Sequence, residues 1–150
     1  MTDKHCFLLG ALLHHFQSLE FLLRSYLNNH SLENSKTQGD YYSLGIGSEL
    51  TENAFTNYDS LGILIDKTNA DLKRRGIDKK IDKSLVEIRD ALAHGRVSAE
   101  NPDGTLRLIK FGKPKAGKVK VDFNEMMTEN WFVSNLERVS NEIEMVHANQ

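Results

Sequence analysis

Residues 86–97 of the chain read Val-Glu-Ile-Arg-Asp-Ala-Leu-Ala-His-Gly-Arg-Val. Strong helix formers fill the first part of this stretch, and its apolar residues recur at the spacing of one helix face. Gly95 is the residue best able to adopt the left-handed conformation that ends a helix, so we expect the helix to stop at His94. The stretch therefore predicts a core helix whose last turns carry an arginine, an aspartate and a histidine.

The polar residues of this helix end are the candidate catalytic groups, namely Arg89, Asp90 and His94. A helix C-terminus favours a cation, which suits an imidazole used for acid–base chemistry. Asp90 precedes His94 by four residues, the spacing at which helical side chains meet, so it can orient the ring. A structural interpretation stays open: Asp90 would pair with Arg89 and Arg96, and His94 would cap the helix.

The two candidate groups do not point in one direction on a single helix. At about 100° per residue, Arg89 and His94 lie about 140° apart on an ideal helix. One unbroken helix therefore cannot aim both side chains at one phosphate. We expect either a loosened last turn at Gly95 or a site built from two copies of the chain.

The segment resembles the HEPN family, whose signature is an arginine, then Asn, Asp or His, then a short spacer and a histidine near a helix end. Here Arg89 and Asp90 are followed by His94 in Ala-His-Gly. The resemblance implies a small helical bundle that dimerises with its two motifs facing each other across a cleft. In active members it also implies metal-independent cleavage of RNA.

Length and composition predict one ordinary soluble domain. The chain has 150 residues, of which 39% are hydrophobic and 27% charged, and its formal net charge is −2. The single Cys6 excludes an intramolecular disulfide and fits a reducing compartment. We find no apolar run of membrane-spanning length and no secretory signal, so we expect a cytoplasmic protein without membrane partners.

The periodicity of apolar residues predicts three further helices. They cover residues 3–28, 51–76 and 128–148, while the motif helix would begin after a cap at Asp78. The second helix would start near Thr51 and bury Ala54 and Tyr58. Residues 29–50 lack periodicity and contain Tyr41-Tyr42, which would anchor the loop on the core or, as the alternative, stack on a base. The predicted fold is an all-α, four-helix up-and-down bundle of the HEPN kind.

A small β insertion is expected between the motif and the last helix. Residues 96–100 and 105–111 flank Asn-Pro-Asp-Gly and predict a hairpin, and residues 118–123 alternate like a third strand. Arg96, Lys110, Lys113 and Lys115 are the candidate RNA-binding residues, because clustered cations with glycine and proline suit a phosphate-binding arm. The alternative interpretation is a solvated hairpin face.

Other chemistries have little support in the sequence. Adjacent His14 and His15 point to different helix faces, and no ligand spacing completes a metal site with His5 or Cys6. We therefore expect no metal and no cofactor. The predicted function is a metal-independent endoribonuclease with a composite site at a homodimer cleft, and more narrowly a toxin or phage-defence effector with an antitoxin partner. The alternative is a non-catalytic helical dimer that binds a nucleotide or a partner protein.

Overall fold

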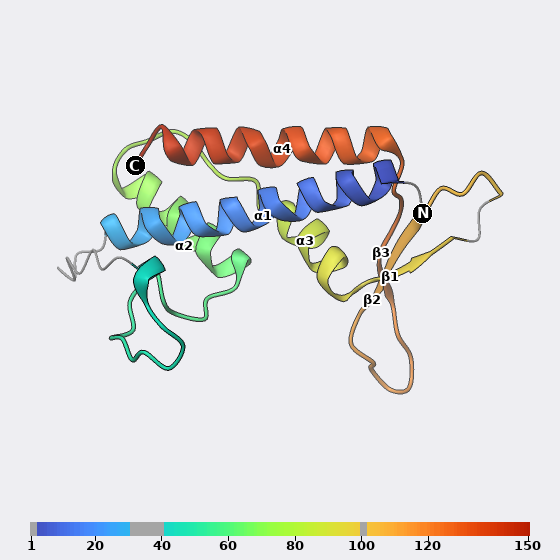
Figure 1. Cartoon of the computed structure of the whole chain (residues 1–150), viewed down its shortest axis with the longest axis horizontal. Helices are drawn as coiled ribbons and strands as arrows, with labels where there is room; N and C mark the ends of the chain where they lie inside the picture. The colour runs from blue at the N-terminus through green and yellow to red at the C-terminus, as the bar shows by residue number, and fades with distance from the viewer. Residues whose placement is uncertain (1–2, 31–40, 100–101) are drawn as a thin grey trace.

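The computed structural model describes residues 3–30, 41–99 and 102–150, without the side chain of Tyr42. These residues form a mainly helical fold with a small antiparallel sheet inserted before the last helix, as the sequence predicted (Figure 1). The helices are α1 (Asp3–Asn29), α2 (Leu61–Arg74), α3 (Leu85–His94) and α4 (Glu129–His147), with a 3₁₀ turn η1 (Tyr41–Ser43). The strands are β1 (Arg96–Ser98), β2 (Arg107–Phe111) and β3 (Val121–Met126).

Helices α1 and α4 form a side-by-side pair that runs in one direction. Lys4 at the start of α1 forms an ion pair with Glu129 at the start of α4. At the other end, Arg75 donates hydrogen bonds both to the Tyr26 hydroxyl of α1 and to the Asn149 carbonyl that follows α4. In an up-and-down bundle of four helices the first and last helices are antiparallel. The predicted up-and-down connectivity is therefore wrong, because a long connection returns the chain before α2 begins (Figure 1).

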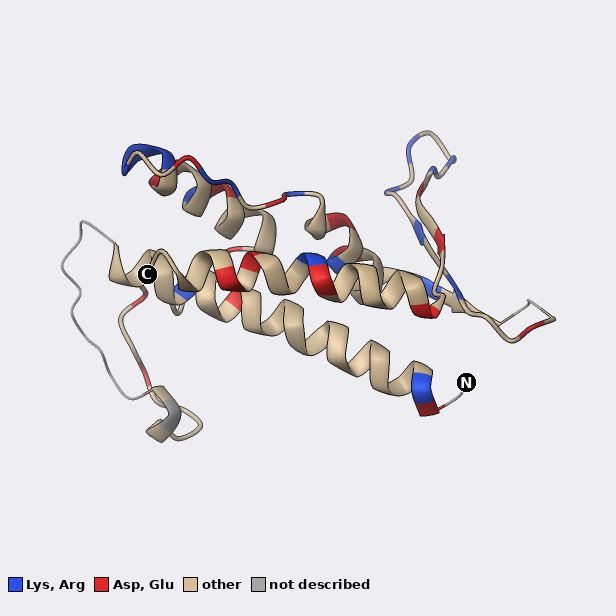
Figure 2. Cartoon of the chain, turned by 90° about the horizontal axis from the view of Figure 1, so that it is seen from above, with Lys and Arg blue, Asp and Glu red and all other residues tan. Residues whose placement is uncertain are grey.

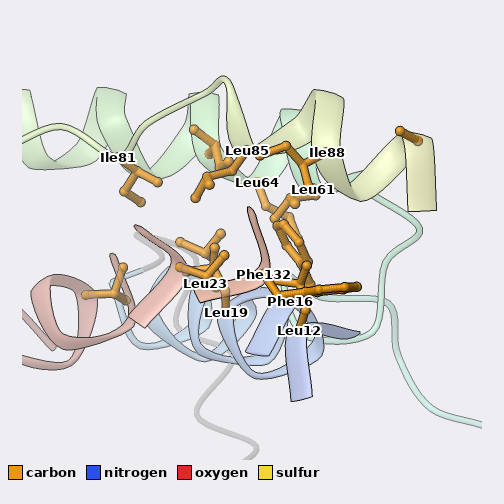
Figure 3. Packing of buried hydrophobic residues seen from close by; sticks show 14 of the residues in the cluster. Leu12, Phe16, Leu19, Leu23, Leu61, Leu64, Ile81, Leu85, Ile88 and Phe132 are labelled. Carbon is orange, nitrogen blue, oxygen red and sulfur yellow. The ribbon is translucent and has the colours of Figure 1, made fainter. Parts of the chain in front are cut away.

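The core lies where α2 and α3 cover one side of this pair. Its residues are apolar side chains at helical spacing, which is what makes each of these segments amphipathic. Ten of them are labelled in Figure 3: Leu12, Phe16, Leu19, Leu23, Leu61, Leu64, Ile81, Leu85, Ile88 and Phe132. Each fully buried leucine or phenylalanine of this kind stabilises the fold by about 1.5–3 kcal/mol relative to an exposed one.

Helix α2 begins at Leu61, which is ten residues after the predicted cap at Thr51. Ser60 is the cap, and its side chain accepts a hydrogen bond from the amide of Ile63. Before it, the Asn53 side chain accepts bonds from the amides of residues 55 and 56, and such a local turn competes with helix formation. The predicted burial of Tyr58 is wrong, because this side chain is fully exposed.

Helix α3 also begins later than predicted, at Leu85 and not after Asp78. The preceding segment is held extended beside α2, because the Asn69 side chain bonds both the amide and the carbonyl of Ile81. Asp82 then accepts bonds from the amide and hydroxyl of Ser84, which turns the chain into the helix. Arg138 of α4 donates to Asp82 at 2.8 Å and lowers the pKa of that carboxyl, so the start of α3 is tied to α4.

The three strands form one antiparallel sheet in the order β1-β2-β3, near the start of α1 and α4 (Figure 1). Strand β2 turns Leu108 into the core, and Leu106 just before it is also buried. The third strand covers Val121–Met126 and therefore lies a few residues later than the predicted 118–123. Helix α4 matches its prediction closely, with Thr128 as the N-cap.

Gly95 ends α3 for a reason that differs from the prediction. Its backbone is extended, at φ −77° and ψ 178°, and not left-handed. A Cβ atom at this position would lie 2.3 Å from the Ala91 carbonyl oxygen and 2.8 Å from Leu108 Cδ1. Glycine is therefore required because β2 passes directly against the end of α3. This close approach is what sets the sheet against the motif helix.

Helix α1 is long and apolar enough to cross a membrane by length and composition alone. The expectation that no apolar run reaches that length is therefore wrong for this helix. The finding is weak evidence for a membrane span, since the core helix of a soluble protein passes the same test. Only 22% of the apolar 18-residue stretch of α1 is buried inside the fold. Phe7 and Leu13 are among the exposed residues of the helix.

Candidate functional site

Arg89, Asp90 and His94 all lie on α3, at or near its exposed end. The side chains of Arg89 and Asp90 are each 38% exposed, and His94 is the last helical residue and is exposed. Because α3 stays regular as far as His94, the separation of about 140° between Arg89 and His94 remains. The last turn does not loosen, so one copy of the chain does not bring these two side chains together.

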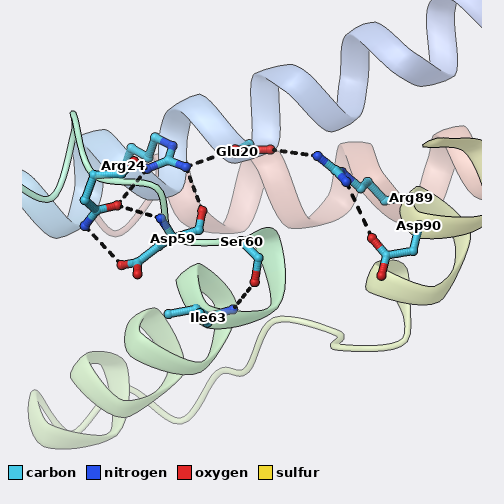
Figure 4. A network of polar contacts seen from close by, with 8 residues as sticks. Glu20, Arg24, Asp59, Ser60, Ile63, Arg89 and Asp90 are labelled. Carbon is cyan, nitrogen blue, oxygen red and sulfur yellow. Dashed lines mark hydrogen bonds and ion pairs between the residues drawn. The ribbon is translucent and has the colours of Figure 1, made fainter. Parts of the chain in front are cut away.

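Two carboxylates hold Arg89 loosely (Figure 4). Its Nη1 lies 3.5 Å from Asp90 Oδ1, and its Nη2 lies 4.0 Å from Glu20 Oε2 of α1. These distances are at or beyond the limit of a hydrogen bond, so the contacts are mainly electrostatic. The guanidinium is therefore oriented toward α1 while it keeps donors for an anionic ligand.

Glu20 is the residue of this site that the sequence did not identify. It is fixed by Arg24, one helical turn later, whose Nη2 lies 3.1 Å from Glu20 Oε1. Arg24 also donates to the carbonyl oxygens of Asn57 and Asp59 at 2.8 and 2.7 Å, which ties the loop before α2 to α1 (Figure 4). The one available signal was the four-residue spacing of Glu20 and Arg24, and that spacing is common on helix surfaces.

Asp90 faces the sheet and not the histidine. Its Oδ2 lies 4.0 Å from Lys110 Nζ of β2, and its Oδ1 faces Arg89. In the described part of the chain, neither a hydrogen bond nor an ion pair involves the His94 ring. The expected pairing of Asp90 with His94 is therefore not made, and the geometry makes Asp90 a positioning residue for Arg89 and Lys110.

The candidate RNA-binding residues lie in three different places. Lys110, with a side chain 23% exposed, lies against α3 through Asp90. The Arg96 guanidinium instead lies over the Phe111 ring, 5.2 Å from its centre, so it covers an apolar part of the sheet. Lys113 and Lys115 are exposed on the connection between β2 and β3, which extends away from the helices (Figure 2).

The connection between β2 and β3 is an ordered hairpin with backbone pairing up to its tip. Lys115 and Lys118 bond each other through both backbone pairs, at 2.8 and 3.1 Å. The two residues between them, Ala116 and Gly117, have φ values of 51° and 73°, as a two-residue hairpin turn requires. The lysines are therefore carried on a twisted two-stranded arm.

Tyr41, the first residue of the aromatic pair, is anchored on α1 through Phe55 and not on the buried core. The Tyr41 ring stacks on Phe55 at 4.4 Å between centres, and Phe55 contacts the edge of Phe21 on α1 at 5.3 Å. Phe55 therefore covers one face of the Tyr41 ring, and the Tyr42 side chain lies outside the described residues.

A second polar cluster joins the C-terminal ends of α1, α2 and α4. The buried Tyr26 hydroxyl donates to Asp71 at 2.8 Å and accepts from Arg75 at 2.7 Å. Burial and the Asp71 carboxylate raise the pKa of Tyr26, while burial and the cation of Arg75 lower the pKa of His30. Arg74 also pairs with Asp71. This cluster links the ends of the three helices. Arg75 makes specific hydrogen bonds in it, in addition to its favourable interaction with the dipole of α2.

Among the described residues, no group of three or more His, Cys, Asp or Glu side chains is arranged to hold a metal ion. Comparison of the chain with family models, with curated proteins and with solved structures finds no match.

Proposed function

We propose that this protein is a metal-independent endoribonuclease of the HEPN type, and that its active site forms where two copies of the chain meet. The observation that carries the proposal is the end of α3. There an exposed imidazole and a loosely held guanidinium lie within two turns of each other, and Lys110 of β2 lies 4.0 Å from the neighbouring Asp90. Their separation around the helix supports a site that a second copy completes.

RNA brings its own nucleophile, so the protein needs to supply only proton transfer and charge stabilisation. In the proposed reaction His94 accepts the proton of the 2′-hydroxyl as that oxygen attacks the adjacent phosphorus. The bond from phosphorus to the 5′-oxygen breaks, and a second imidazole gives that oxygen a proton. The products are a cyclic 2′,3′-phosphate end and a 5′-hydroxyl end. Two copies of the chain provide two copies of His94 for these two roles.

Arg89 stabilises the negative charge that develops on the phosphate oxygens, because a planar guanidinium suits two of them at once. Its carboxylate neighbours at 3.5 and 4.0 Å are far enough for a phosphate to replace them. Asp90 and Glu20 keep the guanidinium aimed before RNA arrives. Lys110, Lys113 and Lys115 bind flanking phosphates, and Arg96 does so at the edge of the sheet.

The outward face of α1 is the surface on which the second copy would dock. Phe7 is 74% exposed and Leu13 is 42% exposed. Leu13 and Glu20 are two helical turns apart and lie on one face, so a partner on Leu13 would also border Glu20 and Arg89. An apolar helix face of this kind normally marks an interaction surface in a soluble protein.

The first test is incubation of purified protein with end-labelled RNA in the presence of a metal chelator. We expect wild type to cut RNA, and Arg89→Ala and His94→Ala each to lose at least about a hundredfold in rate, since stabilisation of the developing charge and general acid–base catalysis each contribute that much. His147→Ala is the matched control, because His147 is also exposed and also the last residue of its helix. Equal cleavage by wild type and His94→Ala would refute the assignment.

The second test asks whether the site is composite. Subunit exchange between equal amounts of wild type and His94→Ala should lower the activity to about a quarter of that of the same total amount of wild type, because one dimer in four keeps both copies of His94; independent sites would leave about half. Leu13→Glu should give a monomer without activity. Ile63→Glu, at a similar exposure of 45% on α2, should stay dimeric and active. An active Leu13→Glu monomer would exclude the composite site.

The rival function is a non-catalytic dimer in which Glu20 and Asp90 simply pair with Arg89. It predicts no cleavage by wild type and a loss of stability in Arg89→Ala.

The proposed enzyme would act in the cytoplasm, as a toxin or phage-defence effector held in check by an antitoxin protein. That narrower role predicts that expression of the protein alone arrests growth. Co-expression with the product of a neighbouring gene should relieve the arrest.

A further inference from the structure

A cavity of about 610 Å³ that is open to solvent lies between the last turns of α2 and the segment that follows it, and most of the residues that line it are exposed. Its size is in the range of small-molecule sites in proteins. Residues of α2 and of the segment 76–80 line it: Asn69, Ala70, Lys73, Gly76, Ile77, Asp78, Lys79 and Lys80. It is formed by residues other than those of the α3 site, so it does not belong to the proposed ribonuclease centre.

The walls of the cavity are fixed by hydrogen bonds at both ends. Asn69 binds the backbone of Ile81 through two bonds, at 2.8 and 3.1 Å, which holds the segment beside α2. At the other end, the amides of Gly76 and Ile77 donate to the carbonyls of Lys73 and Leu72 at 3.1 and 3.0 Å. A cavity held open in this way requires little ordering when a ligand enters.

The charges around the cavity are positive and unpaired. In the described part of the chain, Lys73, Lys79 and Lys80 form no ion pair, and Asp78 is the one acidic side chain that lines the cavity. Other lysines of this region are neutralised: Lys67 pairs with Asp59 at 2.6 Å, and Lys83 pairs with Asp66. In this region of the fold, the lysines without an ion pair are therefore those that line the cavity.

We propose that this cavity binds a small organic phosphate, with the phosphate held by Lys73, Lys79 and Lys80 and an apolar or aromatic part on Ala70 and Ile77. The three ammonium groups favour an anion, and phosphate has enough oxygens to meet several of them. The carbonyl dipole at the end of α2 opposes an anion, but the carbonyls of Asp71, Leu72 and Lys73 already accept backbone bonds there.

The test is isothermal titration of the whole chain with three probes: ADP, inorganic pyrophosphate and adenosine. The salt concentration is kept near 0.1 M to suppress non-specific attraction of anions. We expect ADP to bind, pyrophosphate to bind more weakly and adenosine not to bind measurably. Adenosine binding as tight as ADP, or no binding by any probe, would overturn the proposal.

Three variants distinguish a specific phosphate site from general electrostatic attraction. The triple variant Lys73→Ala/Lys79→Ala/Lys80→Ala should weaken ADP at least about tenfold, because charge-assisted hydrogen bonds are lost. The double variant Lys67→Ala/Lys83→Ala removes lysines of the same region outside the cavity, and it should change the affinity less than about twofold. Ala70→Trp keeps every charge and places an indole over the apolar wall of the cavity, so it should weaken ADP binding at least about tenfold by steric exclusion. Unchanged binding by Ala70→Trp would show that the phosphate is only attracted to the surface.

This proposal is independent of ribonuclease activity. Arg89→Ala should leave ADP binding unchanged, because Arg89 does not line the cavity. A loss of ADP binding in Arg89→Ala would instead place the ligand at α3 and overturn the assignment to this cavity.

Discussion

Replacement of Gly95 by alanine tests how the motif helix is joined to the sheet. The backbone at this position, with φ −77°, is one that alanine adopts without strain. The cost must therefore come from space. An added Cβ would meet the Ala91 oxygen at 2.3 Å, Leu108 Cδ1 at 2.8 Å and the Ile109 oxygen at 3.0 Å.

Two of these three contacts are with backbone oxygen atoms, which cannot rotate away as the end of a side chain can. Ile109 pairs with Arg96 across β1 and β2, so relief of the clash would move β2 away from α3 and disturb the register next to the site. Overpacking of this kind costs about 1–3 kcal/mol. For a domain of this size the change corresponds to a fall in Tm of about 2–12 °C.

The assay is urea denaturation followed by circular dichroism, with Gly10→Ala as the control. Gly10 lies inside α1 with no atom within 4 Å of an added Cβ, so alanine there should raise the stability by about 0.5–1 kcal/mol. Gly95→Asn should be at least as harmful as Gly95→Ala. If asparagine were tolerated much better than alanine, or if Gly95→Ala matched wild type within about 0.5 kcal/mol, glycine would be serving a left-handed cap or no role at all.

Two further predictions concern the cluster at the far ends of the helices. Tyr26→Phe should lower the free energy of unfolding by about 1–3 kcal/mol in urea, because Asp71 and Arg75 both lose a buried partner; an unchanged midpoint would contradict this. The pKa of His30 is lowered by burial and by Arg75, so the neutral ring stabilises the fold fully above the unfolded pKa of about 6.5. That contribution to stability is lost as the pH falls from about 6.5 through the lower pKa of the folded state. His30→Gln has no such titration, so its Tm should fall less steeply between pH 7 and 5 than the Tm of wild type. Parallel Tm profiles for the two proteins would refute the role of His30.

Local sequence signals were reliable where a segment had both a clear period and a strong cap. α1 and α4 were predicted within a residue or two, since long apolar stripes specify a helix and Thr128 is a good N-cap. They failed where a good cap residue competed with a local turn. Thr51 is a good cap residue, but the Asn53 side chain stabilises a turn directly after it, and α2 begins only after the cap at Ser60.

The same contrast holds for the candidate site. The motif residues and the lysine on β2 were identifiable from their types and spacing, and the regular helix up to His94 kept their predicted separation. The partners of those residues were not identifiable. Glu20 is far from Arg89 in sequence, and Asp90 had an equally good local partner in His94 that it does not use.

The sequence by itself determined the helices, the inserted strands and the side chains at the end of α3, because these depend on periodicity, capping and turn chemistry within a few residues. Only the tertiary structure decided that α1 and α4 run in one direction, that β2 passes against Gly95 and that Glu20 reaches Arg89. These features depend on contacts between distant segments. Many pairings of similar apolar faces satisfy the same local pattern, and the packing of the whole chain selects one of them.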